Sequence, residues 1–364
     1  MKDSNHNSSL RNVWRGFILF VLPILVAFLM SGHCVTTYDY IPSAAPPPMN
    51  TNDYSRTDVY HEFSKDAMIH GWFYHTKHKS RAPLVIISHG LGSQKDMGLE
   101  NYAVAFAKVG ISSLVIDYRS FGLSTDKYRN FISPWRHIED IESIVMAVHD
   151  GILLNNSVDS NKIALWGSSL AGGHGIMVAS KLKDKGFLKG IVAQVPHLDG
   201  KAASLRAIKS RGVVGTLRLF CISVADIIRG ILGFSPLYVK IAGLANETAY
   251  MPMTEQDLQT YYSKHPKTYL GNWKNLAPAR TLLFMSRYNP INEIPKLTVP
   301  VLMIGASNDD LCPVSTIEKA FNALQPNRLH RMVTKECTHF DIYVGPVYEE
   351  LKAEMIKFLQ NIFV

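Results

Sequence analysis

Short apolar runs alternate with amphipathic, helix-like segments along most of the chain. A continuous apolar run, the pattern of a strand buried on both faces, occupies residues 83–88, and a second buried strand is predicted at 112–117. Further strands are predicted at 162–166, 188–195, 299–305 and 330–334. Apolar residues at helical spacing occupy residues 99–108, 138–148, 171–182, 316–324 and 348–363. This alternation predicts an α/β fold with a mostly parallel central sheet flanked by helices. An antiparallel hairpin of residues 59–63 and 68–75 is expected at its edge.

The strand–helix rhythm lapses between residues 198 and 290, which predicts an inserted helical cap. Its most apolar part, residues 206–232, is interrupted by Lys209, Arg211, Arg218, Asp226 and Arg229. Such a stripe can pack onto the body of the protein or contact a membrane, and the interrupting charges favour packing.

The N-terminal part of the chain has a different character. Residues 1–16 are polar and carry Lys2, Arg11 and Arg15, and residues 17–30 are apolar apart from one proline. Residues 1–34 therefore read as a signal-like or membrane-anchor segment, although a spanning helix needs about 20 apolar residues. The preceding positive charge predicts a membrane-anchored or exported protein whose folded domain lies outside the cytoplasm. Residues 35–54 are a proline-rich linker, and residues 55–364 are the expected domain.

Composition narrows the class of protein. The 364 residues are 47% hydrophobic and 19% charged, which suits one large α/β domain with a tail. The net charge is +8, but lysine and arginine are spread without long runs, so no nucleic-acid partner is predicted. The four cysteines are scattered without a close pair, and they indicate no metal site. No cofactor is expected.

The stretch from Ala164 to Gly173 contains the pattern of a nucleophile elbow. Gly167 and Ala171 flank Ser169 at two residues on either side, where a sharp strand-to-helix turn needs small residues. A serine hydroxyl becomes a nucleophile only beside a base, and this turn holds it rigidly. Ala171 departs from the usual glycine. A glycine-rich turn without chemistry is the alternative, and Ser168 is a second hydroxyl that is not centred in the pattern.

Three further signals fall at the ends of predicted strands. His89 and Gly90 open a glycine-containing loop after residues 83–88, where the backbone N–H groups of Leu91 and Leu170 are candidates for an oxyanion hole. Asp309 follows the strand at 299–305, and His339 follows the strand at 330–334. Serine, then aspartate, then histidine is the chain order of a triad in this architecture.

On these motifs, residues 55–364 resemble the α/β-hydrolase superfamily. Within it, the chain is similar to the dienelactone-hydrolase-like and Xaa-Pro-peptidase-like esterase branch. The motifs that carry the resemblance are His89–Gly92, Asp117–Ser124, Trp166–Ser169 and Cys337–Asp341. The resemblance implies that Ser169 attacks a carbonyl, that His339 takes and returns the proton, and that Asp309 orients the imidazole. The family places the acid four residues before a proline, which favours Asp309 over the alternative, Asp310.

Other residues near these motifs have two interpretations. His89, Gly90, His174 and His197 are candidate substrate-binding residues. His174 can equally be a buried helix histidine with a satisfied hydrogen bond, and His197 can cap a loop. A disulfide between Cys312 and Cys337 is conceivable, because both lie on loops that should be neighbours. Asp341 is expected to cap the final helix.

The sequence thus predicts a serine hydrolase that cleaves an ester or related acyl bond of a small molecule through an acyl-enzyme. It predicts membrane contact through the N-terminal segment and leaves the oligomeric state open. Two alternatives remain, a serine peptidase acting on short peptides and an inactive protein that keeps the pocket to bind a lipid or small molecule. The basic residues 201–240 suit acidic or acyl substrates better than a peptide amino terminus.

Overall fold

The computed structural model describes residues 32–38, 48–264, 273–327 and 329–364, together with Leu22, Val26 and Met30. The predicted N-terminal anchor at 17–30 falls outside these residues except at those three positions, and much of the predicted linker falls outside them as well. Of the helices formed by described residues, none has the length and apolar character needed to cross a bilayer. The anchor therefore stays a prediction.

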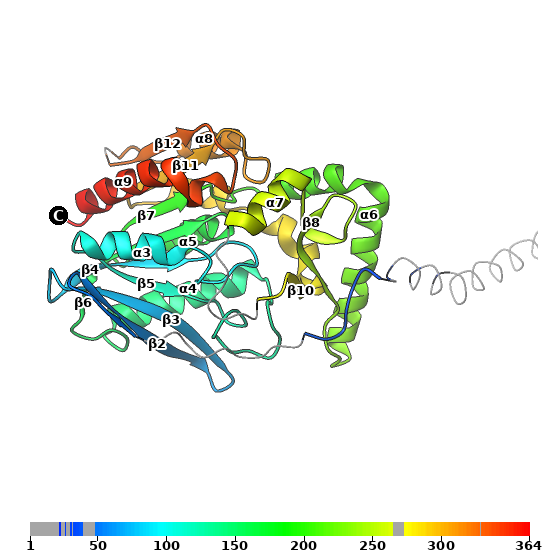
Figure 1. The fold of residues 1–364 in the computed structure, drawn as a ribbon, viewed down its shortest axis with the longest axis horizontal. Helices are drawn as coiled ribbons and strands as arrows, with labels where there is room; N and C mark the ends of the chain where they lie inside the picture. The colour runs from blue at the N-terminus through cyan, green and yellow to red at the C-terminus, as the bar shows by residue number, and fades with distance from the viewer. Residues whose placement is uncertain are drawn as a thin grey trace, which may run out of the picture.

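A nine-stranded sheet forms the centre of the described chain, in the order β1-β2-β3-β5-β4-β6-β7-β11-β12 (Figure 1). Its strands are β1 (Met49–Asn50), β2 (Tyr54–Ser64), β3 (Ala67–Thr76), β4 (Ala82–Ser88), β5 (Ser112–Ile116), β6 (Val158–Ser168), β7 (Leu188–Gln194), β11 (Val301–Ala306) and β12 (Arg331–Lys335). From β5 to β12 all neighbouring strands are parallel, whereas β1, β2 and β3 add to the edge antiparallel. The predicted mostly parallel sheet with an edge hairpin is confirmed.

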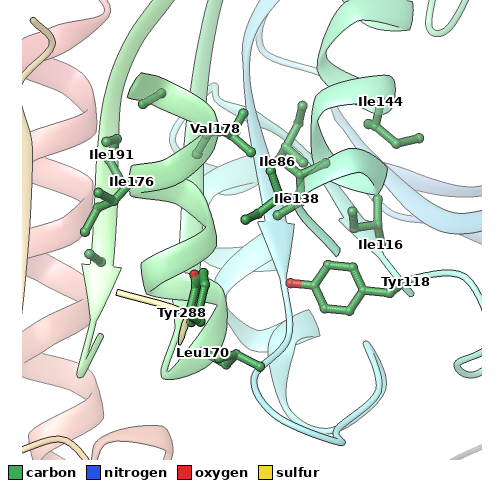
Figure 2. Packing of buried hydrophobic residues seen from close by; sticks show 14 of the residues in the cluster. Ile86, Ile116, Tyr118, Ile138, Ile144, Leu170, Ile176, Val178, Ile191 and Tyr288 are labelled. Carbon is green, nitrogen blue, oxygen red and sulfur yellow. The ribbon is translucent and has the colours of Figure 1, made fainter. Parts of the chain in front are cut away.

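Helices cover both faces of the sheet because its strands are apolar on both sides. The helices are α3 (Leu99–Lys108), α4 (Pro134–His149), α5 (Leu170–Lys181), α8 (Val314–Asn322) and α9 (Gly345–Ile362). On β4, Ile86 packs into the core shared with α4 and α5, and Ile87 packs into the core shared with α3 and α9. Figure 2 shows the first of these cores, with Ile138 and Ile176 on facing helices. Period-two alternation in a strand thus builds two cores at once.

The insertion after β7 contains a second sheet as well as helices. It comprises α6 (Gly200–Ile231), β8 (Tyr238–Leu244), β9 (Ala249–Met253), α7 (Glu255–Lys264), β10 (Leu276–Pro278) and the 3₁₀ segment η2 (Ala279–Arg287), which η3 (Pro290–Lys296) follows. Strands β10, β8 and β9 pair in that order, and Val35 pairs with Tyr238 of β8. The expectation of a helical cap is therefore incomplete, because β8 pairs on one side with the nearby strand β9 and on the other with β10, from which it is separated by residues 245–275.

The end of the chain differs from expectation in one detail. The final helix, α9, begins at Gly345 rather than beside Asp341. The Asp341 carboxylate instead accepts hydrogen bonds from the Thr338 N–H at 2.9 Å and the Thr338 hydroxyl at 2.8 Å. The prediction that Asp341 caps the last helix is wrong, because the residue closes the turn after His339.

Lys95 and Asp117 form a fully buried ion pair beside the loop that follows β4. The Asp117 carboxylate also accepts hydrogen bonds from the backbone N–H groups of Lys95 at 2.8 Å and Leu123 at 3.3 Å. Burial alone would raise the pKa of Asp117, but the Lys95 ammonium outweighs burial and lowers that pKa. At Gly122 a Cβ would lie 1.9 Å from Asp117 Oδ2, so only glycine fits. The pair ties the loop after β4 to the loop after β5.

Replacing Lys95 by methionine should leave the buried Asp117 carboxylate without its counter-ion. We expect Lys95→Met to lower the free energy of unfolding by about 3–5 kcal/mol, as measured by urea denaturation at neutral pH. Lys181→Met is the matched control, because Lys181 pairs with Glu142 at the surface and should contribute less than about 1 kcal/mol. Equal losses in the two variants would show that the buried pair stabilises no more than a surface pair.

Candidate active site

Ser169 stands at a sharp turn between β6 and α5. Its φ is 56° and its ψ is −121°, a conformation that residues other than glycine seldom adopt. An added Cβ at Gly167 would lie 2.3 Å from the carbonyl oxygen of Ala171, so glycine is required there. The departure from the usual pattern at Ala171 is tolerated, because Ala171 is buried within α5 and its backbone does not have a positive φ. The strain of the turn is concentrated at Ser169.

The two adjacent serines have different surroundings. Ser169 is half-buried and lines a large cavity. Ser168 is buried, and its hydroxyl lies 2.6 Å from the Tyr343 hydroxyl and accepts a hydrogen bond from the Gln194 amide at 3.2 Å. Only Ser169 therefore presents its hydroxyl to a ligand.

Asp309 and His339 meet at the carboxyl ends of β11 and β12. His339 Nδ1 lies 2.6 Å from Asp309 Oδ2, and both side chains are buried. The other carboxylate oxygen of Asp309 accepts hydrogen bonds from the N–H groups of Leu311 at 2.8 Å and Cys312 at 2.7 Å. Asp310, the alternative acid, lines the cavity and is exposed. The geometry thus pairs Asp309, not Asp310, with the imidazole.

A cavity of about 840 Å³ lies between the sheet and the insertion. From the sheet side it is lined by Leu91, Ser169, Leu170, His197, Cys312 and His339. From the insertion it is lined mainly by residues of α6, β9 and η2, among them Leu205, Ile208, Phe220, Met251, Met253 and Leu282. This volume is within the usual range for small-molecule sites. The wall of the cavity that the insertion contributes is predominantly apolar.

Two backbone donors lie beside Ser169. Leu91 follows Gly90, where an added Cβ would lie 3.2 Å from the Ser169 Cβ, so the loop after β4 approaches the serine closely. Leu170 is the first residue of α5. In the described part of the chain, no oxygen accepts a hydrogen bond from the N–H of Leu91 or Leu170. Both groups are thus available to a ligand oxygen.

The four candidate substrate-binding residues divide into two groups. His197 lines the cavity, and its N–H bonds the Ser169 carbonyl at 2.9 Å. Gly90 has no side chain, which lets the loop after β4 approach Ser169 closely. His89 and His174 are buried and are not among the residues that line the cavity, so their substrate contact stays a prediction. His174 follows the alternative interpretation, because its Nδ1 lies 2.7 Å from the Tyr288 hydroxyl.

Cys312, which the sequence suggests only as a disulfide partner of Cys337, lies in the candidate site. Cys312 lines the same cavity as Ser169, and burial raises the pKa of its thiol well above its usual range. Both Cys312 and Cys337 are free, so the conceivable disulfide is not formed. Asp309, Cys312 and His339 bring ligand-type atoms within 4.8 Å of one another. A metal there would have to displace the proton shared by Asp309 and His339, so the set fits proton transfer better than metal binding.

A comparison with known protein families identifies the chain. The family model described as Hydrolase_4, serine aminopeptidase, S33, matches residues 79–340, well over half of the sequence. The chain belongs to this family. It is an α/β-hydrolase, as its motifs led us to expect.

Related proteins support the same placement. The hydrolase is 28% identical over 299 residues to the quorum-quenching protein AidA of Acinetobacter baumannii, which covers 82% of this chain and 93% of AidA. It is 24% identical over 291 residues to the thiohydrolase aneE of Aspergillus aculeatus, covering 78% and 87% of the two chains. The crystal structure of the α/β-hydrolase GrgF from Penicillium sp. sh18 superimposes with a TM-score of 0.68 at 21% identity, covering 85% and 99%. The last similarity shows the fold alone.

A chain of aromatic and imidazole rings lies behind the elbow of the hydrolase. His137 Nδ1 lies 3.3 Å from His174 Nε2, and the His137 ring stacks on Tyr118 with centroids 4.0 Å apart. Figure 2 shows Tyr118 and Tyr288 approaching the end of α5 that carries Leu170. The sequence gives no signal for this cluster, because its four members come from four separate segments.

Burial keeps these histidines neutral. It lowers the pKa of His89 and of His197 to about 4, and it lowers the pKa values of His137 and His174 well below the ordinary 6.5. Below pH 6.5 these histidines are therefore protonated in the unfolded chain but remain neutral in the folded hydrolase. Stability from these groups is present above pH 6.5 and is lost as the pH falls toward 4, by about 1.4 kcal/mol per pH unit for each proton.

We expect His137→Phe, which retains a ring against Tyr118, to lose less stability than the native chain between pH 6.5 and pH 4. The slope of the free energy of unfolding against pH, measured from denaturation curves across this range, should differ between the two proteins by the equivalent of about one bound proton. Burial raises the pKa of Asp140 to about 6, so protonation of Asp140 stabilises the folded state as the pH falls, opposite to the effect of the histidines. Comparing the variant with the native chain cancels this contribution. His78→Gln is the control at an exposed histidine. An unchanged slope for His137→Phe would contradict the assignment.

Proposed function

We propose that the protein is a serine hydrolase that cleaves an ester, thioester or related acyl bond of a small molecule through an acyl-enzyme. The observation that carries the proposal is the placement of Ser169 and His339 on the wall of one cavity, with His339 held by Asp309 at 2.6 Å. In this reaction the Ser169 hydroxyl attacks the carbonyl carbon while His339 takes its proton. His339 then returns the proton to the leaving group, and a water molecule releases the acid by the same route.

The oxyanion of each tetrahedral intermediate would lie between the N–H groups of Leu91 and Leu170. Both groups border the cavity and are free of described acceptors. Such donors stabilise the transition state by about 2.7–4 kcal/mol each, because they are already oriented when charge develops. The Asp309 carboxylate keeps the His339 proton on Nδ1, which leaves Nε2 free to act as the base.

The cavity wall supports an acyl substrate. The sides contributed by the insertion are mostly apolar, and four basic residues line the cavity against two carboxylates: Lys201, Arg206, Lys209 and Arg211 against Asp257 and Asp310. A thiohydrolase and a quorum-quenching protein among the relatives are consistent with this choice.

A second candidate is an aminopeptidase acting on short peptides. It is favoured by Asp257 and Asp310, which line the cavity and could bind a substrate amino group. The two candidates share the same nucleophile and differ only in what the cavity recognises.

A fluorophosphonate probe should label Ser169 in the purified full-length protein. We expect Ser169→Ala to abolish labelling, and both Ser169→Ala and His339→Ala to reduce kcat on an activated ester by about 10⁴-fold or more. Ser204→Ala is the control, since Ser204 also lines the cavity but lies on α6. Labelling that persists in Ser169→Ala would refute the nucleophile. A native protein that neither labels nor hydrolyses any acyl or peptide substrate would instead support the inactive binding protein.

The length of the acyl chain should control the rate. Burial of each methylene contributes about 0.8 kcal/mol, so kcat/KM should rise up to about fourfold per carbon from acetate to octanoate esters. Ala207→Trp, which adds bulk to the cavity wall, should lower the octanoate rate more than the acetate rate. Faster turnover of aminoacyl anilides than of any ester would favour the peptidase instead.

A further inference from the structure

Helix α6 carries an apolar face that no described residue covers. Its exposed apolar side chains at helical spacing are Val213, Leu217, Phe220, Ile228 and Ile231. Spacings of three, four and eight residues put them on one side of the helix. Val213 is 82% exposed and Ile231 is 79% exposed. The opposite side, with Leu219 and Ile222, is buried. The expectation that the apolar stripe packs onto the body is therefore right for only one of two apolar faces.

The exposed face continues beyond both ends of this stripe. Leu205 and Ile208 are exposed on the first part of α6, before the break at Gly212, and Leu232 and Phe234 are exposed just after the helix. Isolated exposed apolar residues are ordinary, whereas a large contiguous set marks an interaction surface. We call the residues Leu205, Ile208, Val213, Leu217, Phe220, Ile228, Ile231, Leu232 and Phe234 the α6 face.

The charged side chains of α6 that are not fully buried are all basic. Its basic residues are Lys201, Arg206, Lys209, Arg211, Arg218 and Arg229, and its acidic residue is Asp226. Asp226 is buried and bonded to Arg280, so it does not offset the positive charge at the surface. Lys201 and Lys209 are exposed. An apolar face bordered by lysine and arginine is the composition of helices that lie in the interface of an anionic membrane.

The apolar N-terminal run joins the described fold beside this helix. Met30 and Cys34 pack against the core, and Val35 pairs with Tyr238. Burial first, and then the positive charge of Arg218 on α6, lower the pKa of His33. In Figure 1 the dark-blue segment containing these residues lies next to α6. The chain therefore enters the described fold, at Met30 to Val35, next to α6.

The α6 face is also continuous with the site. Leu205, Ile208 and Phe220 are exposed to solvent, and they line the cavity that contains Ser169 and His339. An apolar path thus leads from the surface of α6 toward the elbow.

We propose that the α6 face is a membrane-docking surface, with α6 lying in the headgroup region of a bilayer that contains anionic phospholipids. The exposed apolar side chains enter the acyl boundary, the lysines and arginines contact lipid phosphates, and the cavity opens toward the membrane. A second copy of this chain is a poorer occupant, because a symmetric pairing would bring the basic residues of two α6 helices together. This inference goes beyond the proposed reaction and does not require it.

The experiment uses full-length protein in which the half-buried Cys34 and Cys221 are replaced by serine. An environment-sensitive fluorophore is attached at Ile231→Cys on α6 or at Ala353→Cys, an exposed position on α9 at the other end of the molecule (Figure 1). Each protein is mixed with phosphatidylcholine vesicles with or without phosphatidylglycerol, and some vesicles carry lipids with a quencher just below the headgroup. The same label is then measured in a variant with Val213→Asp and Leu217→Asp.

We expect a blue shift and quenching at position 231 only, at least several-fold stronger with phosphatidylglycerol and lost in the double aspartate variant. Neither Val213 nor Leu217 lines the cavity, so fluorophosphonate labelling of that variant should be unchanged and serves as a check of folding. A protein that floats with vesicles while the label at 231 stays in water would overturn the proposal. So would equal quenching at both positions, or a shift that depends on protein concentration without lipid and so reports self-association. Failure of the proposed reaction would show separately, as absence of fluorophosphonate labelling.

Discussion

The backbone of Ser169 is the constraint on which the site depends. A left-handed φ at a residue with a side chain costs about 1–3 kcal/mol, and it persists only where the surroundings fix it. Here the Ser169 N–H bonds the Gln194 carbonyl at 2.9 Å, and the Ser169 carbonyl accepts bonds from Gly172 and His197. Strand β7 and helix α5 thus hold the residue from both sides. The turn starts the helix, directs the hydroxyl into the cavity and leaves the Leu170 N–H without an acceptor among the described residues.

The same turn explains why the region behind it is so densely packed. Gly167, Gly172 and Gly173 lack side chains where a Cβ would lie within 3 Å of neighbouring atoms, so the elbow is pressed against adjacent loops. Imidazole rings pack beneath α5, where His137 Nδ1 lies 3.3 Å from His174 Nε2 and His174 Nδ1 lies 2.7 Å from the Tyr288 hydroxyl. Their neutrality follows from burial, and it makes the rigidity of the elbow sensitive to acid. The Lys95–Asp117 pair performs the corresponding task for the loop that carries Leu91.

The sequence was most informative where periodicity and chain order act locally. The strands that end near Ser169 and Asp309 approach the site through buried apolar residues, so their positions could be predicted, whereas β12 before His339 is a partly exposed edge strand. Parallel pairing brings the carboxyl ends of all three together. The directions of side chains could not be predicted in the same way. His174 lies five residues beyond Ser169, which on a helix turns it well away from the cavity, and Cys312 lines the cavity while Cys337 does not. In the insertion, β8 pairs with β10 and, at Tyr238, with Val35, which are distant in the sequence, and no local pattern specifies those partners.

The two apolar faces of α6 follow from the physics of the insertion. One face must be buried to attach the insertion to the core, and Leu219 and Ile222 do this. A globular helix needs no second apolar face, and exposing one to water is unfavourable by about 25 cal/mol per Å². In a bilayer interface that cost disappears. An acyl chain moving from lipid into an apolar cavity also exchanges one apolar environment for another, so its burial would contribute little to binding from the membrane. Selectivity would then depend on the polar end of the substrate, where the basic residues of α6 and the donors beside Ser169 are located.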